Sequence, residues 1–261
     1  MKVTVIGGGN MGGALAKHWS EAYEVTVADR SESLLEKIQS EHPNIKISTN
    51  NIEAIKGADV IAIVVKPWVM EIVLKEITSY IVPSKQIICS VAAGVTSGHV
   101  NEILSAGGCG GAPVCYCIPN IAAEFGQSMS FISTGKYVTP EQKATIVSMF
   151  ENVGAVKVVS EDLVASGMMM ASCGIAYVMR FIRAMTEGGI EMGFFSGDAK
   201  DIAIQTMRGA IALLSETGMH PEEAIDKVTT PGGVTIKGLN ELDHAGFNSA
   251  VIRCLKAGLN K

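Results

Sequence analysis

Three glycines near the start of the chain, Gly7, Gly9 and Gly12, constrain the fold more than any other sequence feature. They follow Lys2–Ile6, a short β-branched run typical of a fully buried strand in a parallel sheet. They lead into Asn10–Trp19, which has helical periodicity. In such a unit the first glycine allows the tight turn, the second lets the backbone approach a pyrophosphate, and the third lets the helix pack on the strand. The stretch predicts a dinucleotide-binding turn, and the alternative is a glycine-rich turn on an unrelated α/β sheet.

A second signal for the same ligand comes at the end of the next expected strand, Glu24–Ala28. The phosphates are expected at the N-terminus of the first helix, where unpaired N–H groups and the helix dipole favour negative charge. The adenosine ribose is expected at an acidic residue after the second strand, and Asp29 stands there. Asp29 favours a free 2′-OH, as in NADH, whereas Arg30 and Ser31 suit a 2′-phosphate, as in NADPH. The sequence therefore predicts use of both cofactors.

Composition excludes several classes of protein. The 261 residues are 48% hydrophobic and 18% charged, which indicates a globular protein with an ample core. A net charge of −5 without a basic run argues against nucleic acid or an anionic membrane as a partner. A first strand at residue 2 leaves no room for a signal peptide, and the most apolar stretch, Leu163–Met179, is interrupted by Gly, Ser and Cys. The six cysteines lack metal-ligand spacing, so we expect buried thiols in a reducing cytoplasm and no metal site.

The order of the expected elements predicts the fold class. Helices and buried strands alternate as far as the strand at residues 113–118, which is typical of a Rossmann-type doubly wound parallel sheet. Residues 129–133 and 155–159 are expected as edge strands, and no strand signal remains after Asp162. The prediction is an α/β chain with a dinucleotide-binding domain at 1–160 and an all-α domain for substrate and dimerisation at 161–261.

The first helix of the second domain bears on the oligomeric state. Leu163–Met192 reads as one long helix with no charge before Arg180. A helix that is apolar all round must be buried on all sides, and about 100 residues can hardly enclose it. We expect an interface helix in an obligate oligomer; the alternative is the central helix of a monomeric bundle.

Ligands of open parallel sheets bind beyond the carboxyl ends of the strands. Lys66 lies at one such end and suits phosphate or nicotinamide, although a solvated surface lysine is an equal interpretation. A second candidate is the glycine- and hydroxyl-rich stretch Asp226–Gly238, in which a helix is expected to begin at Ile236. Its backbone N–H groups suit a small anion such as a carboxylate; the alternative is a plain interhelical loop.

Two absences point to the bond that is reduced. The chain has no Tyr-x-x-x-Lys pair, and it has no lysine between Asp162 and Lys200. Oxidation of an alcohol needs a base to take the hydroxyl proton, whereas a protonated imine already accepts hydride at carbon. The sequence therefore favours chemistry at a C=N bond.

Over nearly its whole length the chain resembles the pyrroline-5-carboxylate reductases. The most specific match is to their S-P-G-G-x-T-I signature, in the stretch Lys227–Gly238. The other matching stretches are Gly7–Gly12, Val65-Lys66-Pro67, Ser90–Gly94, Pro119-Asn120 and His220-Pro221. The resemblance implies reduction of L-1-pyrroline-5-carboxylate to L-proline by NADP(H), with NAD(H) as a second cofactor. It also implies a homodimer or higher oligomer formed through the C-terminal helices, in the cytoplasm.

The resemblance also assigns site residues. The substrate carboxylate would be bound by backbone N–H groups from Gly232 to Thr235, and the hydroxyl of Thr235, the expected catalytic residue, would face the ring nitrogen. The expected substrate-binding residues are Thr230, Gly232, Gly233, Val234, Thr235 and Asn120. The expected cofactor-binding residues are Gly7, Gly9, Asn10, Met11, Gly12, Asp29, Arg30, Ser31, Asn51, Val65, Lys66, Pro67, Ala92, Ala93 and Asn120.

Several positions depart from the family pattern. Tyr116 stands where the family has the arginine of Arg-x-Met-Pro-Asn-Thr-Pro, Met168 replaces a threonine, and Thr230 replaces a serine. The stretch Ser172–Tyr177 replaces Gly-Ser-Gly-Pro-Ala-Tyr. These changes leave two alternatives: a dinucleotide-binding paralogue with little catalysis and a regulatory role, or a reductase of another cyclic imine.

Overall fold

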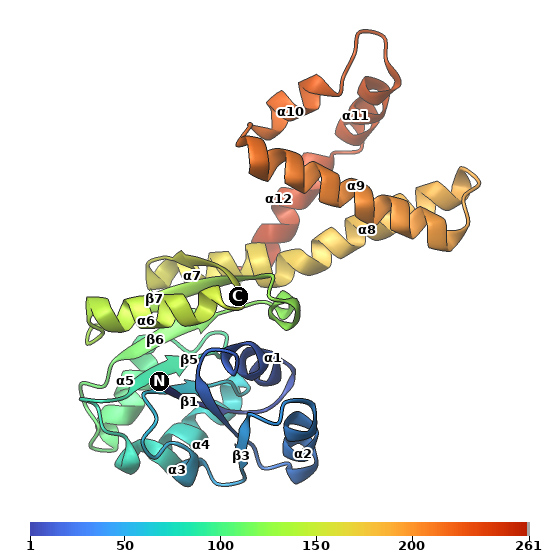
Figure 1. The fold of residues 1–261 in the computed structure, drawn as a ribbon. Coiled ribbons are helices and arrows are strands. Elements are labelled where there is room, and N and C mark those ends of the chain that lie inside the picture. Colours follow the sequence, from blue (N-terminus) through green and yellow to red (C-terminus); the bar gives the residue numbers. More distant parts are fainter. Residues whose placement is uncertain (260–261) are drawn as a thin grey trace. The chain divides into compact units, whose positions relative to one another are not determined.

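A computed structural model describes residues 1–259 (Figure 1). The chain forms two compact units, which divide between Ser172 and Cys173. The sequence places the domain boundary near Ser160, and the last two residues of its second domain, 260–261, lie outside the described residues.

The first unit is built on an eight-stranded sheet in the order β3-β2-β1-β4-β5-β6-β7-β8. All neighbouring strands are parallel except β6 and β7. Parallel neighbours require crossover connections, which are right-handed, and this gives the doubly wound sheet that the alternation predicts. The strands are β1 (Lys2–Ile6), β2 (Glu24–Ala28), β3 (Lys46–Ser48), β4 (Val60–Ile63), β5 (Ile87–Ser90), β6 (Val114–Ile118), β7 (Ser128–Thr134) and β8 (Gly154–Val158).

The expectation of an edge strand at residues 129–133 is wrong. Strand β7 lies between β6 and β8, with the pairs Tyr116↔Ser133 and Ile132↔Val158 on its two sides. The short 3-10 segment η2 (Ile121–Phe125) reverses the chain after β6, so β7 returns antiparallel. Over residues 1–259 the edges of the sheet are β3 and β8, so the strand expected at residues 155–159 is an edge strand.

Helices cover both faces of the sheet. The core on one face is filled from α1 (Asn10–Trp19), α2 (Glu32–Glu41) and α6 (Pro140–Glu151). The core on the other face is filled from α4 (Pro67–Ile77) and α5 (Ser97–Ala106), with the segment after α3 (Asn51–Ala54) at its margin. The short η1 (Thr78–Tyr80) extends α4, and α7 (Glu161–Met168) packs on β6 and β7.

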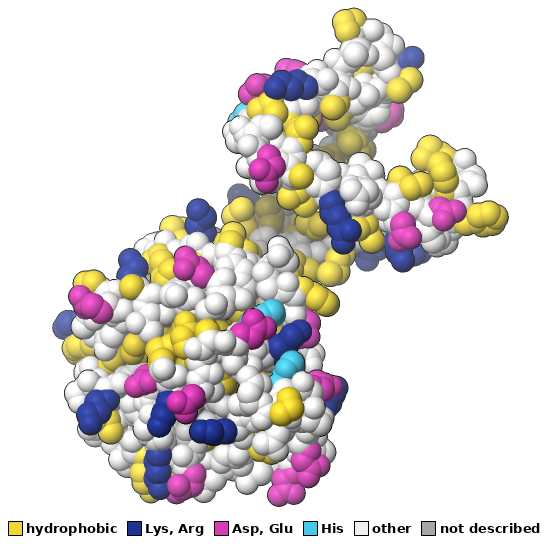
Figure 2. All heavy atoms as spheres, viewed as in Figure 1, with side chains coloured by type: hydrophobic (Ala, Val, Ile, Leu, Met, Phe, Trp, Pro, Cys, Tyr) yellow, Lys and Arg dark blue, Asp and Glu magenta, His cyan; other side chains and the backbone are white. Residues whose placement is uncertain are grey.

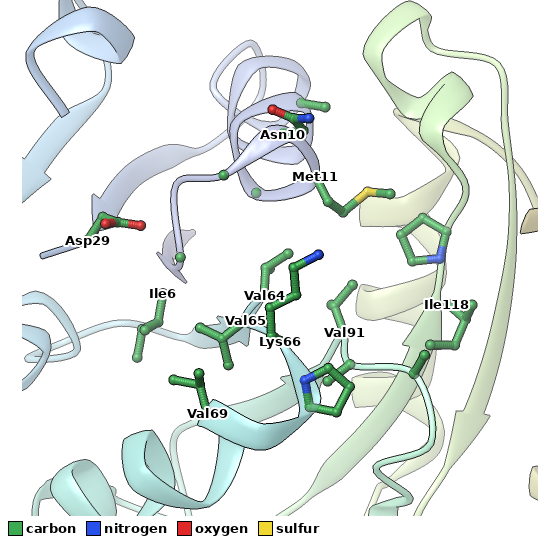
Figure 3. A pocket seen from close by; sticks show the side chains of 18 of the residues that line it. Ile6, Asn10, Met11, Asp29, Val64, Val65, Lys66, Val69, Val91 and Ile118 are labelled. Carbon is green, nitrogen blue, oxygen red and sulfur yellow. The ribbon is translucent and has the colours of Figure 1, made fainter. Parts of the chain in front are cut away.

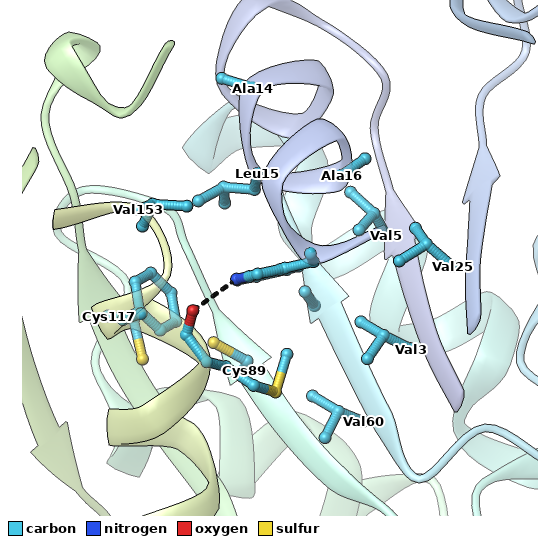
Figure 4. Close-up of a cluster of buried hydrophobic side chains, with 14 of the residues drawn as sticks. Val3, Val5, Ala14, Leu15, Ala16, Val25, Val60, Cys89, Cys117 and Val153 are labelled. Carbon is cyan, nitrogen blue, oxygen red and sulfur yellow. Dashed lines mark hydrogen bonds between the residues drawn. The ribbon is translucent and has the colours of Figure 1, made fainter. Parts of the chain in front are cut away.

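Trp19 anchors the larger core. Its indole Nε1 donates a hydrogen bond to the Met149 carbonyl oxygen at 2.7 Å, the dashed line in Figure 4. Its ring meets Phe150 edge to face, with centroids 5.4 Å apart. Cys115 and Cys117 lie in the same core, and burial raises the pKa of both thiols well above the ordinary value. They are inert packing groups, because the thiolate is the reactive form.

The second unit consists of helices α8 (Gly174–Glu191), α9 (Ser196–Thr217), α10 (Pro221–Lys227), α11 (Val234–His244) and α12 (Phe247–Ala257). Helices α8 and α9 form a hairpin, and a Cβ on Gly189 would come within 2.9 Å of the Ala199 Cβ. Helices α11 and α12 contain no buried residue. Large hydrophobic side chains are exposed on them, namely Val234, Ile236, Leu242, Phe247, Val251 and Ile252. Hydrophobic side chains lie scattered over the surface of the second unit (Figure 2).

The long helix expected at Leu163–Met192 is present, with a π-helical turn inside it. The helical segment Glu161–Glu191 consists of α7, a π-helical turn η3 (Met169–Cys173) and α8. Within residues 1–259 it is the one helical segment long and apolar enough to cross a membrane by length and composition, with a mean hydropathy of 1.4. Only 17% of that window is buried within this chain, and a helix that packs against a partner subunit has the same composition.

Candidate cofactor-binding site

A cleft of about 1140 Å³ opens at the carboxyl ends of the strands in the first unit (Figure 3). Its wall is formed by residues that end or follow β1, β2, β4, β5 and β6, such as Ile6, Ala28, Val64, Val91 and Ile118. This is where an open parallel sheet binds its ligand. Most of the lining side chains are apolar. The polar groups of a ligand would therefore be bound by the backbone and by a few polar or charged side chains.

The glycine turn between β1 and α1 has the geometry that its spacing predicts. Gly7 has a φ of +103°, and its N–H donates to the Ala28 carbonyl oxygen at 2.7 Å. A Cβ on Gly12 would overlap the Gly7 carbonyl oxygen, so only glycine allows this approach of helix to turn. A Cβ on Gly9 would meet no protein atom within 4 Å. Gly9 therefore faces open space in the cleft, where the backbone can approach a pyrophosphate.

Helix α1 begins at this turn. Gly9 is its N-cap, and no side chain satisfies the N–H groups of its first turn. The first turn contains no acidic residue. The unpaired N–H groups therefore face the cleft at the positive end of the helix dipole. No carboxylate in this turn competes with a phosphate for these N–H groups, so the turn suits bound phosphate.

Asp29, after β2, is engaged with the backbone on both oxygens. Its Oδ2 accepts the Gly8 N–H at 2.8 Å, and its Oδ1 accepts the Ser31 N–H at 3.0 Å. The carboxylate thus ties the glycine turn to the loop after β2. A carboxylate has about four lone-pair sites, so two remain for a ribose hydroxyl. Arg30, exposed beside it, also lines the cleft.

Two further polar residues reach the cleft from the starts of helices. Lys66 is the N-cap of α4, and Figure 3 shows its ammonium group extending into the cleft. Asn51 begins α3, and its side-chain Nδ2 donates to the Glu76 carboxylate at 2.9 Å. Ala92 and Ala93 follow β5 and present small side chains to the same space.

The predicted cofactor residues all line this cleft except Ser31 and Asn120. Ser31 caps α2 by accepting the Leu34 N–H. Asn120 is buried, and its Oδ1 accepts the Ala122 N–H at 3.1 Å while its Nδ2 donates to the Ala171 carbonyl oxygen at 3.4 Å. Both residues are therefore engaged in holding the turns beside the cleft.

Sequence reasoning missed part of the lining. Ile121 and Phe125 reach the cleft from η2, and Phe125 is 79% exposed. Met168 and Ser172 reach it from α7 and the π-helical turn, and the Ser172 hydroxyl donates to the Pro119 carbonyl oxygen at 3.2 Å. Met168 and Ser172 had stood out only as departures from the family pattern, and nothing in the periodicity pointed to η2.

The second sequence candidate lies in the second unit. Gly232 has a φ of +72°, and the Gly233 N–H donates to the Thr230 carbonyl oxygen at 2.9 Å. Helix α11 begins at Val234 rather than at Ile236, with Gly233 as its N-cap and no side-chain cap. Thr235 therefore lies in the first helical turn and is not the N-cap of α11. The loop does bring Thr230, Gly232, Gly233, Val234 and Thr235 to one helix N-terminus.

The fold and the cleft define a dinucleotide-dependent oxidoreductase of the Rossmann type. Residues 2–94 match a family model described as NADP oxidoreductase, coenzyme F420-dependent. Residues 161–261 match a model described as pyrroline-5-carboxylate reductase dimerisation.

Known proteins of similar sequence extend this match over the whole chain. Pyrroline-5-carboxylate reductase of Methanosarcina acetivorans is 34% identical over 97% of this chain and 94% of its own length. Pyrroline-5-carboxylate reductase 1 of Dictyostelium discoideum is 34% identical over 99% of this chain, which spans about half (49%) of that protein. The chain belongs to the pyrroline-5-carboxylate reductase family.

Solved structures agree on the fold. Pyrroline-5-carboxylate reductase of Coxiella burnetii superposes with a TM-score of 0.91 at 25% identity, covering 99% of this chain and 96% of that one. The enzyme of Streptococcus pyogenes superposes with a TM-score of 0.84 at 25% identity, covering 99% and 98%.

Proposed function

We propose that this chain reduces L-1-pyrroline-5-carboxylate to L-proline with NADPH, the last step of proline biosynthesis. The observation that carries the proposal is the cleft of the first unit, in which a glycine turn, Asp29 and Lys66 meet at one edge of the sheet in a member of this family. When bound, the cofactor supplies the hydride for the C=N carbon.

The residues of the cleft fit NADP(H). The turn at Gly9 and the first turn of α1 suit the pyrophosphate, because the N–H groups there are unpaired and open to the cleft. Arg30 suits a 2′-phosphate, and the remaining lone pairs of Asp29 suit a 2′-OH. This chain is therefore expected to accept NADPH and NADH, with NADPH preferred, as the family match favours.

The substrate carboxylate is assigned to the N-terminus of α11. The first-turn N–H groups there have no side-chain cap, and Gly232 at φ +72° makes the tight turn that leads into them. The Gly233 N–H is bonded to the Thr230 carbonyl oxygen inside that turn, so the carboxylate is assigned to the N–H groups of the first helical turn. The Thr235 hydroxyl lies on that first turn and is assigned to the ring nitrogen of the protonated imine, which it holds by a hydrogen bond while the C=N carbon accepts hydride. The substrate is thus a cyclic imino acid, recognised through its carboxylate and its nitrogen.

The assay that tests the proposal is oxidation of NADPH with L-1-pyrroline-5-carboxylate, run beside other cyclic imines and beside NADH. We expect turnover with pyrroline-5-carboxylate above every other imine and a higher kcat/KM with NADPH than with NADH. A different preferred imine would make this a reductase of that compound. NADPH binding without turnover of any imine would identify a non-catalytic paralogue. Met168, which lines the cleft where the family has threonine, is the departure in the cleft that raises this alternative.

The apolar surface of the second unit supports a homodimer or higher oligomer through the C-terminal helices. Light scattering at micromolar concentration is expected to give at least twice the 27.5 kDa of one chain. Ile252 on α12 is 57% exposed, so Ile252→Glu should hardly change the free energy of unfolding of a monomer. In an oligomer that buries Ile252, the same substitution should cause dissociation. The matched control is Ile72→Glu on α4, also exposed, which should leave the mass unchanged. A wild-type mass of one chain would contradict this prediction.

The cytoplasm is proposed as the location. All six cysteines, which lie within the described residues, are free thiols, as a reducing compartment preserves them.

A further inference from the structure

Tyr116, on β6, is a buried tyrosine whose hydroxyl contacts the backbone of a loop beside the cleft. The residue is 5% exposed, and its ring packs in a small cluster with Ile118 and Val164. Its phenolic oxygen accepts a hydrogen bond from the Gly94 N–H at 2.8 Å. Burial raises the pKa of Tyr116 above its ordinary value, although the Gly94 hydrogen bond lowers it in part and the nearby Glu161 carboxylate raises it. The phenol is therefore neutral at physiological pH.

Gly94 lies at the apex of the loop that follows β5. The loop begins where the Val91 N–H donates to the Ile63 carbonyl oxygen at 3.0 Å. Its tight turn is closed by the Val95 N–H, which donates to the Ala92 carbonyl oxygen at 3.1 Å. Gly94 has a φ of +81°, so its N–H points out of the turn. No acceptor within this loop bonds to that N–H. Tyr116 supplies the acceptor.

The far end of the same loop is held independently. Thr96 is the N-cap of α5, and Ser97 follows it in the first turn. Both the N–H and the hydroxyl of Ser97 donate to the Glu161 carboxylate at the start of α7, the N–H at 3.1 Å. The loop is thus fixed at Val91 and at Ser97, while its apex depends on Tyr116.

The order of the strands in the sheet indicates which part of the cofactor lies against this loop. In a unit of this kind the adenosine ribose is bound after β2 and the pyrophosphate after β1. Strands β4 and β5 lie on the other side of β1 from β2. The loop after β5, which contributes Val91, Ala92 and Ala93 to the cleft, therefore faces the nicotinamide half.

We propose that Tyr116 is a positioning residue: its hydroxyl fixes the Ala92–Gly94 loop in the shape against which the nicotinamide half of the cofactor binds. The inference rests on the proposed function. Tyr116 acts through the backbone and is not a catalytic residue. Because the loop is anchored at both ends, loss of the hydroxyl should loosen the apex without unfolding the protein.

The test is Tyr116→Phe, which keeps the ring and removes the oxygen. Fluorescence titration should show Kd for NADPH raised roughly 3- to 10-fold, as expected for loss of one neutral hydrogen bond. In the absence of cofactor, hydrogen exchange at the Gly94 amide should become faster, while exchange in β5 and β6 stays unchanged. The control is Tyr137→Phe, an exposed tyrosine outside the cleft, which should change neither quantity.

A lower melting temperature with unchanged Kd and unchanged exchange at Gly94 would overturn the proposal, because Tyr116 would then serve packing alone. Wild-type protein that binds NADPH but reduces no imine would overturn the proposed reductase activity while leaving the role of Tyr116 in place. Wild-type protein without affinity for NADPH would overturn both.

Discussion

Gly9→Ala is expected to weaken NADPH binding about 100-fold, which corresponds to about 2.8 kcal/mol, while leaving the protein folded. The added Cβ meets no protein atom within 4 Å, so the fold has room for it. That same space is where a pyrophosphate must approach the backbone, so the added methyl group should displace it and break a hydrogen bond to a charged group, which is worth about 1.5–3 kcal/mol. The expected stability loss is about 1 kcal/mol or less, because alanine is a poorer N-cap than glycine.

Two neighbouring glycines give matched controls for this result. Gly13 lies inside α1, outside the cleft, and a Cβ there would come only within 3.5 Å of the Gly8 carbonyl oxygen. Gly13→Ala should therefore bind NADPH normally and be more stable by about 0.5–1 kcal/mol. Gly12→Ala should lose both affinity and stability, since its Cβ would overlap the Gly7 carbonyl oxygen. Wild-type affinity in Gly9→Ala would show that the ligand does not contact this turn.

Thr235→Val is the second change with a large expected effect. Valine has nearly the shape of threonine, so the substitution removes the hydroxyl with little change in packing. If the hydroxyl contacts the charged substrate, kcat/KM for the imine should fall about 10- to 150-fold, which corresponds to about 1.5–3 kcal/mol. Because Gly233 is the N-cap of α11, Thr235→Val removes no cap. Its melting temperature should stay within a few degrees of wild type.

Thr235→Ser is the control, because it keeps the hydroxyl and removes only the methyl group. It should retain most of the activity, and both variants should bind NADPH as the wild type does, since Thr235 is no part of the cofactor cleft. Wild-type kcat/KM in Thr235→Val, whatever its melting temperature, would end the assignment of Thr235 as the catalytic residue.

The cofactor cleft was predictable from sequence because its parts are local. A strand, a turn with glycines at fixed spacing and a helix lie within Lys2–Trp19, and each glycine has a backbone reason that spacing alone conveys. Asp29 follows one strand later, so its place beside the turn depends only on the pairing of β1 with β2. Right-handed crossovers then bring the loops after β4 and β5 to the same edge.

The rest of the cleft depends on contacts between distant segments. Ile121 and Phe125 line it because η2 turns the chain back after β6, and that turn also puts β7 inside the sheet. Ser172 lines it from a π-helical turn, whose Ala171 carbonyl and Ser172 hydroxyl bond to Asn120 and Pro119. Hydrophobic periodicity reports that a face is buried, but not which distant segment covers it.

The amino-acid sequence by itself determined the fold class, the strands, the family and the cofactor turn, because these follow from side-chain periodicity and from glycine spacing within single units. The tertiary structure decided the order β6-β7-β8, the π-helical turn in Glu161–Glu191 and the start of α11 at Val234. It also gave Tyr116 its partner, since Gly94 and Tyr116 are far apart in the chain and meet only through the pairing of β5 with β6. Hydrogen bonds between distant segments have no local pattern, so they are settled only when the chain folds.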